Sequence, residues 1–155
     1  MATPEDTPLT LHNLSYFVHV GLGILALATF WTSGLSRKGS PVHRASGKLY
    51  LLAMTGLLLA AVPLTALLGA RNPVAGGFLA YLVVITTTSV WTSWRAVKDK
   101  KDWARFTGPV YRVLMVANLL SGLAIAYVGL FVTNQMQVIF VAFSSIGIIG
   151  AVNMW

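Results

Sequence analysis

Four long stretches of the chain carry no charged residue: residues 7–36, 49–70, 72–94 and 113–155. A helix needs roughly 20 apolar residues to cross the hydrocarbon core of a bilayer. The first three stretches each fit one crossing, and the last is long enough for two. The run at residues 57–62, Leu-Leu-Leu-Ala-Ala-Val, lacks the polar–apolar alternation of a barrel strand. Because backbone groups in lipid must be paired internally, the pattern predicts five membrane-spanning helices.

We expect these helices within a single domain covering residues 1–155, at about residues 14–35, 49–70, 76–96, 110–132 and 138–154. Turn-forming pairs separate them. Ser40-Pro41 fits the start of an element that leads into the second helix, and Asn72-Pro73 with Gly76-Gly77 fits the turn before the third. The expected fold class is therefore an all-α integral membrane protein, a bundle of about five transmembrane helices.

The composition agrees with a membrane protein. Hydrophobic residues make up 56% of the 155 residues and charged residues only 10%, whereas soluble domains carry about 25% charged residues. The chain has no cysteine, which excludes disulfides, thiolate metal sites and a cysteine nucleophile. No phosphate-binding glycine loop or zinc-binding HExxH motif occurs, and no acid, base and nucleophile converge. We therefore expect a protein that is not an enzyme and that has no metal site.

The basic residues predict the orientation. Of the 11 lysines and arginines, all except Arg71 lie in two segments, residues 37–48 and 95–112. With five spans both segments lie on one side, which the positive-inside rule makes the cytoplasmic side. The N-terminus, with Glu5 and Asp6, is then outside and the C-terminus inside. Tryptophans prefer the membrane interface, and those at the predicted inner boundary are Trp31, Trp91, Trp94, Trp103 and Trp155.

The segment after the first predicted helix is the most distinctive. It contains Lys38-Gly39, His43-Arg44, Gly47 and Tyr50, with the spacing Lys-Gly-x3-His-Arg-x2-Gly-x2-Tyr. It resembles a signature found in a family of uncharacterised bacterial multi-spanning membrane proteins, known only as a domain of unknown function. The resemblance covers about the first 60 residues. It implies a multi-pass protein of the bacterial inner (cytoplasmic) membrane and a first-helix histidine, here His19, but no established activity.

Histidines are the main candidates for a cofactor. A histidine inside a membrane span is a functional-site hypothesis, and His19 could be an axial ligand of haem or (bacterio)chlorophyll. His43 lies on the inner side, about 20–25 Å from His19 on a ~30 Å core, so one chain cannot form a bis-histidine haem site. A site completed by another subunit stays open, as does a hydrogen bond from His19 to a neighbouring helix. His43 and Arg44 form either a cofactor or quinone-headgroup site, or a topology signal.

Basic and aromatic residues at the inner face predict contacts with lipid or a partner. Anionic headgroups attract each basic residue by about 1 kcal/mol, and a basic, aromatic segment at a membrane boundary more often lies in the interface than binds nucleic acid. Docking of a cytoplasmic partner is the alternative. The residues concerned are Arg37, Lys38, Lys48, Trp91, Trp94, Arg95, Lys98, Lys100, Lys101, Trp103 and Arg105.

Small and hydroxyl-bearing residues within the spans have two interpretations. Gly122–Ala126 and Gly147–Ala151, at four-residue spacing, favour close helix packing. Thr86, Ser89 and Ser93 share one face of the third helix and could line the path of a small solute. Helical Ser and Thr also bond to the carbonyl four residues earlier, which favours packing. No Asp or Glu lies in a predicted span, which disfavours ion-coupled transport.

Three functions are compatible with these features. The first is a non-catalytic accessory or scaffold subunit of a larger membrane complex, in contact with lipid and with other membrane subunits. The second is an electron-transfer or pigment-binding protein associated with a tetrapyrrole or quinone. The third is a small-solute transporter. We favour the first, because the spans contain small-residue faces and no carboxylate.

Overall fold

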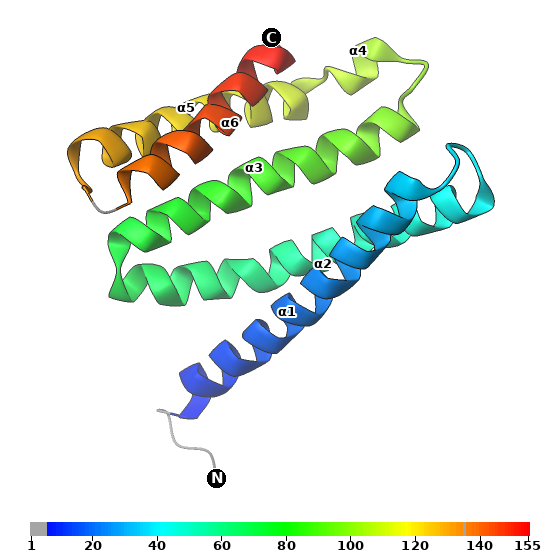
Figure 1. The fold of residues 1–155 in the computed structure, drawn as a ribbon. Helices are drawn as coiled ribbons and strands as arrows, with labels where there is room; N and C mark the ends of the chain where they lie inside the picture. Colours follow the sequence, from blue (N-terminus) through cyan, green and yellow to red (C-terminus); the bar gives the residue numbers. More distant parts are fainter. Residues whose placement is uncertain (1–5, 135) are drawn as a thin grey trace. The chain divides into compact units, whose positions relative to one another are not determined.

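The computed structural model describes residues 6–134 and 136–155, and side chains from residue 13 onward. Glu5 and the side chain of Asp6, which enter the expected orientation, lie outside this description. The described residues form six helices (Figure 1), which are α1 (Asp6–Leu35), α2 (Pro41–Arg71), α3 (Pro73–Lys98), α4 (Trp103–Phe106), α5 (Pro109–Phe131) and α6 (Gln137–Met154).

The predicted fold class is confirmed. The described part of the chain contains helices and turns and no strand. Five of its helices are long and apolar enough to cross a membrane, through Asn13–Leu35 of α1 and the whole of α2, α3, α5 and α6. The side of the membrane on which each end lies stays a prediction.

Three helices begin several residues earlier than expected. The first of them, α1, begins at Asp6 and not near residue 14. Ser40 and Pro41 start α2 itself rather than a separate element, because the His43 N–H donates to Ser40 Oγ at 3.1 Å. Arg44 and Lys48, expected in a loop, therefore lie in the first turns of α2.

The third helix likewise begins at Pro73, because Asn72 Oδ1 accepts the Ala75 N–H at 3.1 Å. Gly76 and Gly77 consequently belong to the helix and not to the turn before it. The four-residue α4 was not predicted. It is capped by Asp102, whose Oδ1 accepts the Arg105 N–H at 3.0 Å.

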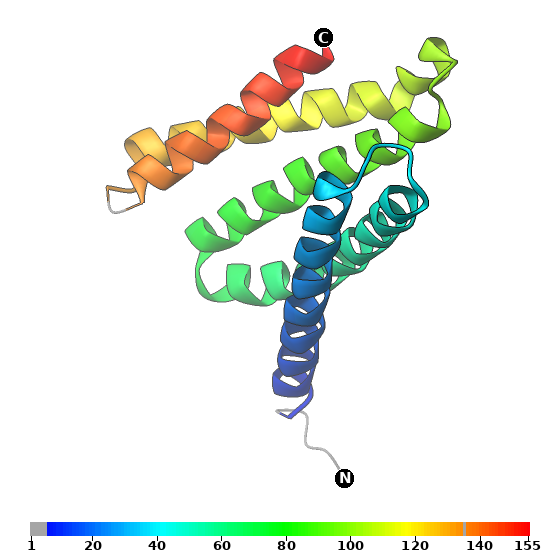
Figure 2. The same cartoon turned by 45° about the vertical axis from the view of Figure 1, so that its right-hand side comes forward.

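The chain divides into two compact units, one ending at Leu67 and the other beginning at Leu68. The first is the hairpin of α1 and α2 (Figure 2), whose turn contains Gly39 at a φ of 82°, a conformation that favours glycine. From residue 13 onward, the α1 residues that are buried or half-buried recur at helical spacing: Ser15, His19, Leu22, Gly23, Ala26, Thr29 and Ser33. This helical periodicity identifies the face of α1 that packs on α2.

Small residues allow the two helices of the hairpin to approach closely. A side chain carbon at Gly23 would lie 3.5 Å from Leu57 Cδ1, and one at Gly47 would lie 3.6 Å from Ser33 Oγ. Both are ordinary contact distances, so the backbones are separated by little more than one side chain.

The second unit is built on α3, α5 and α6. Its core is formed by Tyr81, Ile125 and Phe140, and Phe78 stacks on Phe140 with ring centroids 4.6 Å apart. The helices α5 and α6 run side by side in both views (Figures 1 and 2). They meet at Gly129, where a Cβ would come within 2.8 Å of Phe140 Cβ. Glycine at 129 therefore makes room for the most deeply buried aromatic ring.

The Tyr81 hydroxyl is inserted into the backbone ladder of α6. It donates to the Phe143 carbonyl and accepts the Gly147 N–H at 3.0 Å. These two backbone groups are four residues apart and would otherwise be candidates for a hydrogen bond to each other. Insertion of a side chain into this ladder is a recognised cause of local helix distortion. Here it joins α3 to α6 through two hydrogen bonds in the membrane interior.

Gly147→Ala is expected to weaken this junction. The new Cβ would lie 2.7 Å from the Tyr81 hydroxyl and 3.2 Å from the Asn118 carbonyl, so overpacking should lower the free energy of unfolding by about 1–3 kcal/mol. Unfolding in mixed detergent micelles measures this. Gly77→Ala is the control, because its Cβ meets nothing within 4 Å. Equal stability of the two variants would contradict the proposed role of Gly147.

Candidate functional site

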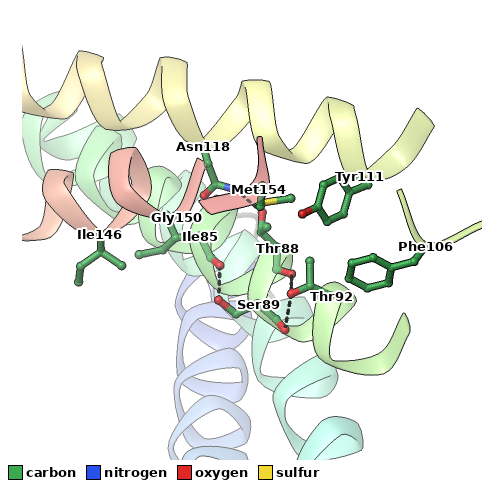
Figure 3. Close-up of a pocket in the computed structure, with 10 residues that line it drawn as sticks. All are labelled: Ile85, Thr88, Ser89, Thr92, Phe106, Tyr111, Asn118, Ile146, Gly150 and Met154. Carbon is green, nitrogen blue, oxygen red and sulfur yellow. Dashed lines mark hydrogen bonds between the residues drawn. The ribbon is translucent and has the colours of Figure 1, made fainter. Parts of the chain in front are cut away.

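A pocket of about 270 Å³ lies within the second unit (Figure 3). Its polar lining consists of Thr88, Ser89 and Thr92 from α3, with Tyr111 and Asn118 from α5. The rest of the lining is Ile85, Phe106, Ile146, Gly150 and Met154. None of these residues is charged, so the pocket combines neutral hydrogen-bonding groups with apolar walls.

The hydroxyls of α3 use their hydrogens within their own helix. Thr88 Oγ1 donates to the Val84 carbonyl at 2.9 Å and Ser89 Oγ to the Ile85 carbonyl at 2.9 Å. Thr92 Oγ1 donates to the Thr88 carbonyl at 2.8 Å. Toward the pocket, these hydroxyls therefore offer oxygen lone pairs, which accept hydrogen bonds.

Asn118 bridges α5 to α3 beside the pocket. Its side chain amide donates to Thr88 Oγ1 at 2.7 Å and to the Leu114 carbonyl at 2.8 Å. Both residues are buried, Asn118 with 3% of its surface exposed and Thr88 with 6%. Both amide hydrogens are therefore in use, and no described residue donates to Asn118 Oδ1.

Tyr111 is the unpaired polar group of the pocket. Only 8% of its surface is exposed, and its ring packs against Phe106 with centroids 5.2 Å apart. Its hydroxyl has no hydrogen-bond partner among the described residues, and it points toward the middle of the lining residues in Figure 3. The oxygen of this hydroxyl retains some accessible surface, so a molecule in the pocket can form a hydrogen bond with it.

The pocket was only partly anticipated. Of Thr86, Ser89 and Ser93, the face considered for a solute, only Ser89 lines it. Thr88 and Thr92 were not singled out, although their spacing from one another is also helical. Asn118 was the available signal, because an amide in an apolar span needs a partner on a neighbouring helix.

The two histidines considered for a cofactor each form a contact between α1 and α2. His19 Nδ1 lies 3.2 Å from the Leu57 carbonyl, and His43 Nδ1 lies 3.0 Å from the Ser33 carbonyl. Since a carbonyl only accepts, each Nδ1 carries the proton and donates. One histidine donates from α1 to α2 and the other from α2 to α1. Each Nε2 remains free to accept a hydrogen bond or bind a metal.

The remaining residues of the first basic segment are on the surface. Arg37 and Lys38 lie in the turn after α1, and Arg44 and Lys48 lie on α2, with all four exposed. The cofactor roles predicted separately for His19 and for His43 with Arg44 stay predictions. Within the described residues no cluster of three metal-ligating side chains occurs.

The second basic segment is folded around a carboxylate that sequence reasoning did not single out. Asp99 pairs with Arg95 Nε through Oδ2, and its Oδ1 lies 3.8 Å from Arg105 Nε. The Asp99 side chain is only 2% exposed. Arg95 also donates from Nη2 to the Arg105 carbonyl at 2.8 Å. Two of the predicted lipid-contacting arginines therefore hold the connection from α3 to α4.

Two basic side chains of this segment lie over tryptophan rings. Lys98 Nζ lies 4.8 Å from the centre of the Trp94 ring, and Arg95 lies over Trp91 at 5.5 Å. Such cation–π contacts hold charge beside aromatic rings that favour the interface. Lys100, Lys101 and Trp103 are exposed.

The predicted packing residues lie at different depths. A Cβ at Gly122 would be 3.2 Å from the Ser144 carbonyl, and one at Gly147 would meet Tyr81. Ala151 is 3% exposed, whereas Ala126 is half-buried. Gly129 also permits a close approach of α5 to α6 and was not among the predicted packing residues.

The chain matches no protein-family model, no curated protein and no solved structure. The resemblance of residues 38–50 to the bacterial family therefore stays a prediction.

Asp99→Asn is expected to loosen the segment between α3 and α5. The change removes the charge that pairs with Arg95, and breaking a buried ion pair costs about 3 kcal/mol. Limited trypsin digestion should then cut at Lys100 or Lys101 at least tenfold faster than in the original protein. Asp102→Asn is the matched control, because asparagine caps a helix as well as aspartate does. Equal cleavage of the two variants would contradict the role given to Asp99.

Proposed function

We propose that the chain is a non-catalytic accessory subunit of a larger membrane assembly, and that the face of α1 opposite α2 contacts the other subunits. The observation that carries this proposal is an exposed face that combines two small residues with large apolar ones. It consists of Phe17, Gly21, Ile24, Ala28 and Leu35.

The shape of this face suits another helix. A Cβ at Gly21 would meet nothing within 4 Å, and Ala28 lies on the same side two turns later. The flanking Phe17, Ile24 and Leu35 are 67–82% exposed. A shallow depression between large side chains is the geometry that transmembrane helices use for close association.

Sparse burial within the chain supports the same proposal. In the five spans, the most apolar stretch of each helix has only 11–22% of its residues buried. Polar contacts to a partner are not needed for association in lipid, because packing of small against large side chains suffices. Exposed Lys100 and Lys101 would add attraction to anionic headgroups of the bilayer in which this assembly sits.

The double variant Gly21→Leu, Ala28→Leu is expected to release the chain from its assembly, because two leucines fill the depression. Native mass measurement after mild detergent extraction should show a loss of at least tenfold in the bound fraction. Val20→Leu with Leu27→Phe is the control, since it adds bulk on the flank of the same helix. Particles containing only multiples of 16.7 kDa would indicate self-association and contradict an accessory role.

A second candidate function is tetrapyrrole binding through His19. It is favoured by the His19 Nδ1 contact with the Leu57 carbonyl, because histidines that bind metals usually donate their other ring N–H to such an acceptor. The imidazole would then offer Nε2 to an axial position completed by another subunit.

An absorption spectrum of the purified assembly tests this second function. If His19 is an axial ligand, a Soret band is present and His19→Ala removes it. His43→Ala is the control and should leave the band unchanged. A colourless assembly, or a band equally strong in His19→Ala, would eliminate the tetrapyrrole function without affecting the accessory role.

A further inference from the structure

The pocket of the second unit offers more free hydrogen-bond acceptors than free donors. Ser89 and Thr92 direct their hydrogens to helix carbonyls, and Asn118 uses both amide hydrogens on other protein groups. Their oxygens remain as acceptors. Tyr111 alone in this lining has a hydroxyl with no partner among the described residues. A complementary ligand must therefore supply donors and at least one acceptor.

The charge and the shape of the pocket further restrict the class of ligand that fits it. The lining contains no charged residue, so an ion would enter without a partner at a high desolvation cost. Ile85, Ile146 and Met154 supply apolar surface, and Phe106 supplies an aromatic ring. Pockets for drug-sized ligands hold about 300–1,000 Å³, so 270 Å³ suits a small ligand such as a single ring.

We propose that this pocket binds a neutral hydroxylated aromatic ring of the hydroquinone class, with ring hydroxyls that donate to the α3 and Asn118 oxygens and accept from Tyr111. A hydroquinone has apolar faces and donors at its edge, as the lining requires. The corresponding quinone accepts but does not donate, so it satisfies Tyr111 and leaves the other oxygens unpaired. This site is independent of the α1 face and of any partner subunit.

Binding of methylhydroquinone to the purified full chain, measured anaerobically by calorimetry in detergent, tests the proposal. We expect its dimethyl ether, which cannot donate, to bind at least tenfold more weakly. Tyr111→Phe removes one hydrogen bond and retains the ring, so it should weaken binding about fivefold to tenfold.

Two glycines provide a matched pair of blocking and control variants. A Cβ at Gly150 or at Gly77 meets nothing within 4 Å, so both positions have room where a side chain begins. Gly150 lines the pocket and Gly77 does not. Gly150→Leu should therefore abolish binding, and Gly77→Leu should bind as the original protein does.

Three results would overturn the proposal. They are undiminished binding to Gly150→Leu, equal affinity for the dimethyl ether, and no detectable binding to the original chain. A decyl-substituted hydroquinone identifies the natural source. If it binds at least tenfold more tightly and still requires Gly150, the ligand is a lipid-soluble hydroquinone. If both probes bind equally, the pocket takes a free phenolic molecule.

Discussion

Polar side chains within lipid must find partners inside the protein, and in this chain most of those partners are backbone carbonyls. Thr29, Thr55 and Thr88 return their hydrogens to carbonyls of their own helices. Three other residues extend the same chemistry between helices, and they are His19, His43 and Tyr81. Asn118 on α5 instead donates to the hydroxyl of Thr88 on α3. Because the hydrophobic effect does little to associate helices in lipid, these bonds and the close packing beside them determine how each unit is held together.

Two glycines of α6 differ in their roles, because one permits close packing and the other borders the pocket. At Gly147 the space left by the missing side chain is taken by the Tyr81 hydroxyl. This hydroxyl accepts the Gly147 N–H and donates to the Phe143 carbonyl. At Gly150, less than one turn later, the corresponding space is open and borders the pocket. Two glycines that look equivalent in the sequence therefore have opposite structural roles.

The distribution of charge was sufficient to predict the spans, because lipid excludes charge wherever the chain crosses. It was not sufficient to predict where α2 begins. Ser40 and Pro41 start α2 inside the basic segment, and the helix continues from this cap into the apolar span without a break. The same limit applies to His19. Its place inside a predicted span identified it as unusual, and the identification of Leu57 as its partner required the register of two helices.

The pocket was harder to predict for a related reason. Periodicity shows which hydroxyls share a face of α3, but not which face meets α5 and α6. Tyr81 and Tyr111 both lie in predicted spans, and only packing distinguishes the hydroxyl that bonds to α6 from the one without a partner. Asp99 was overlooked because it lies among basic residues, where a carboxylate looks like part of a solvated loop.

The ion pair of Asp99 and the pocket are physically connected through α4. Arg95 holds the Arg105 carbonyl, and Arg105 is the immediate neighbour of Phe106, which forms part of the pocket wall and packs on Tyr111. The aromatic wall therefore depends on a charged cluster outside the apolar span, and Trp103 stacks on the same ring with centroids 5.4 Å apart. Tryptophan and basic side chains favour the membrane interface, so this end of the pocket lies where amphiphilic molecules place their polar heads. A ligand that enters from the interface would meet Phe106 and Tyr111 first.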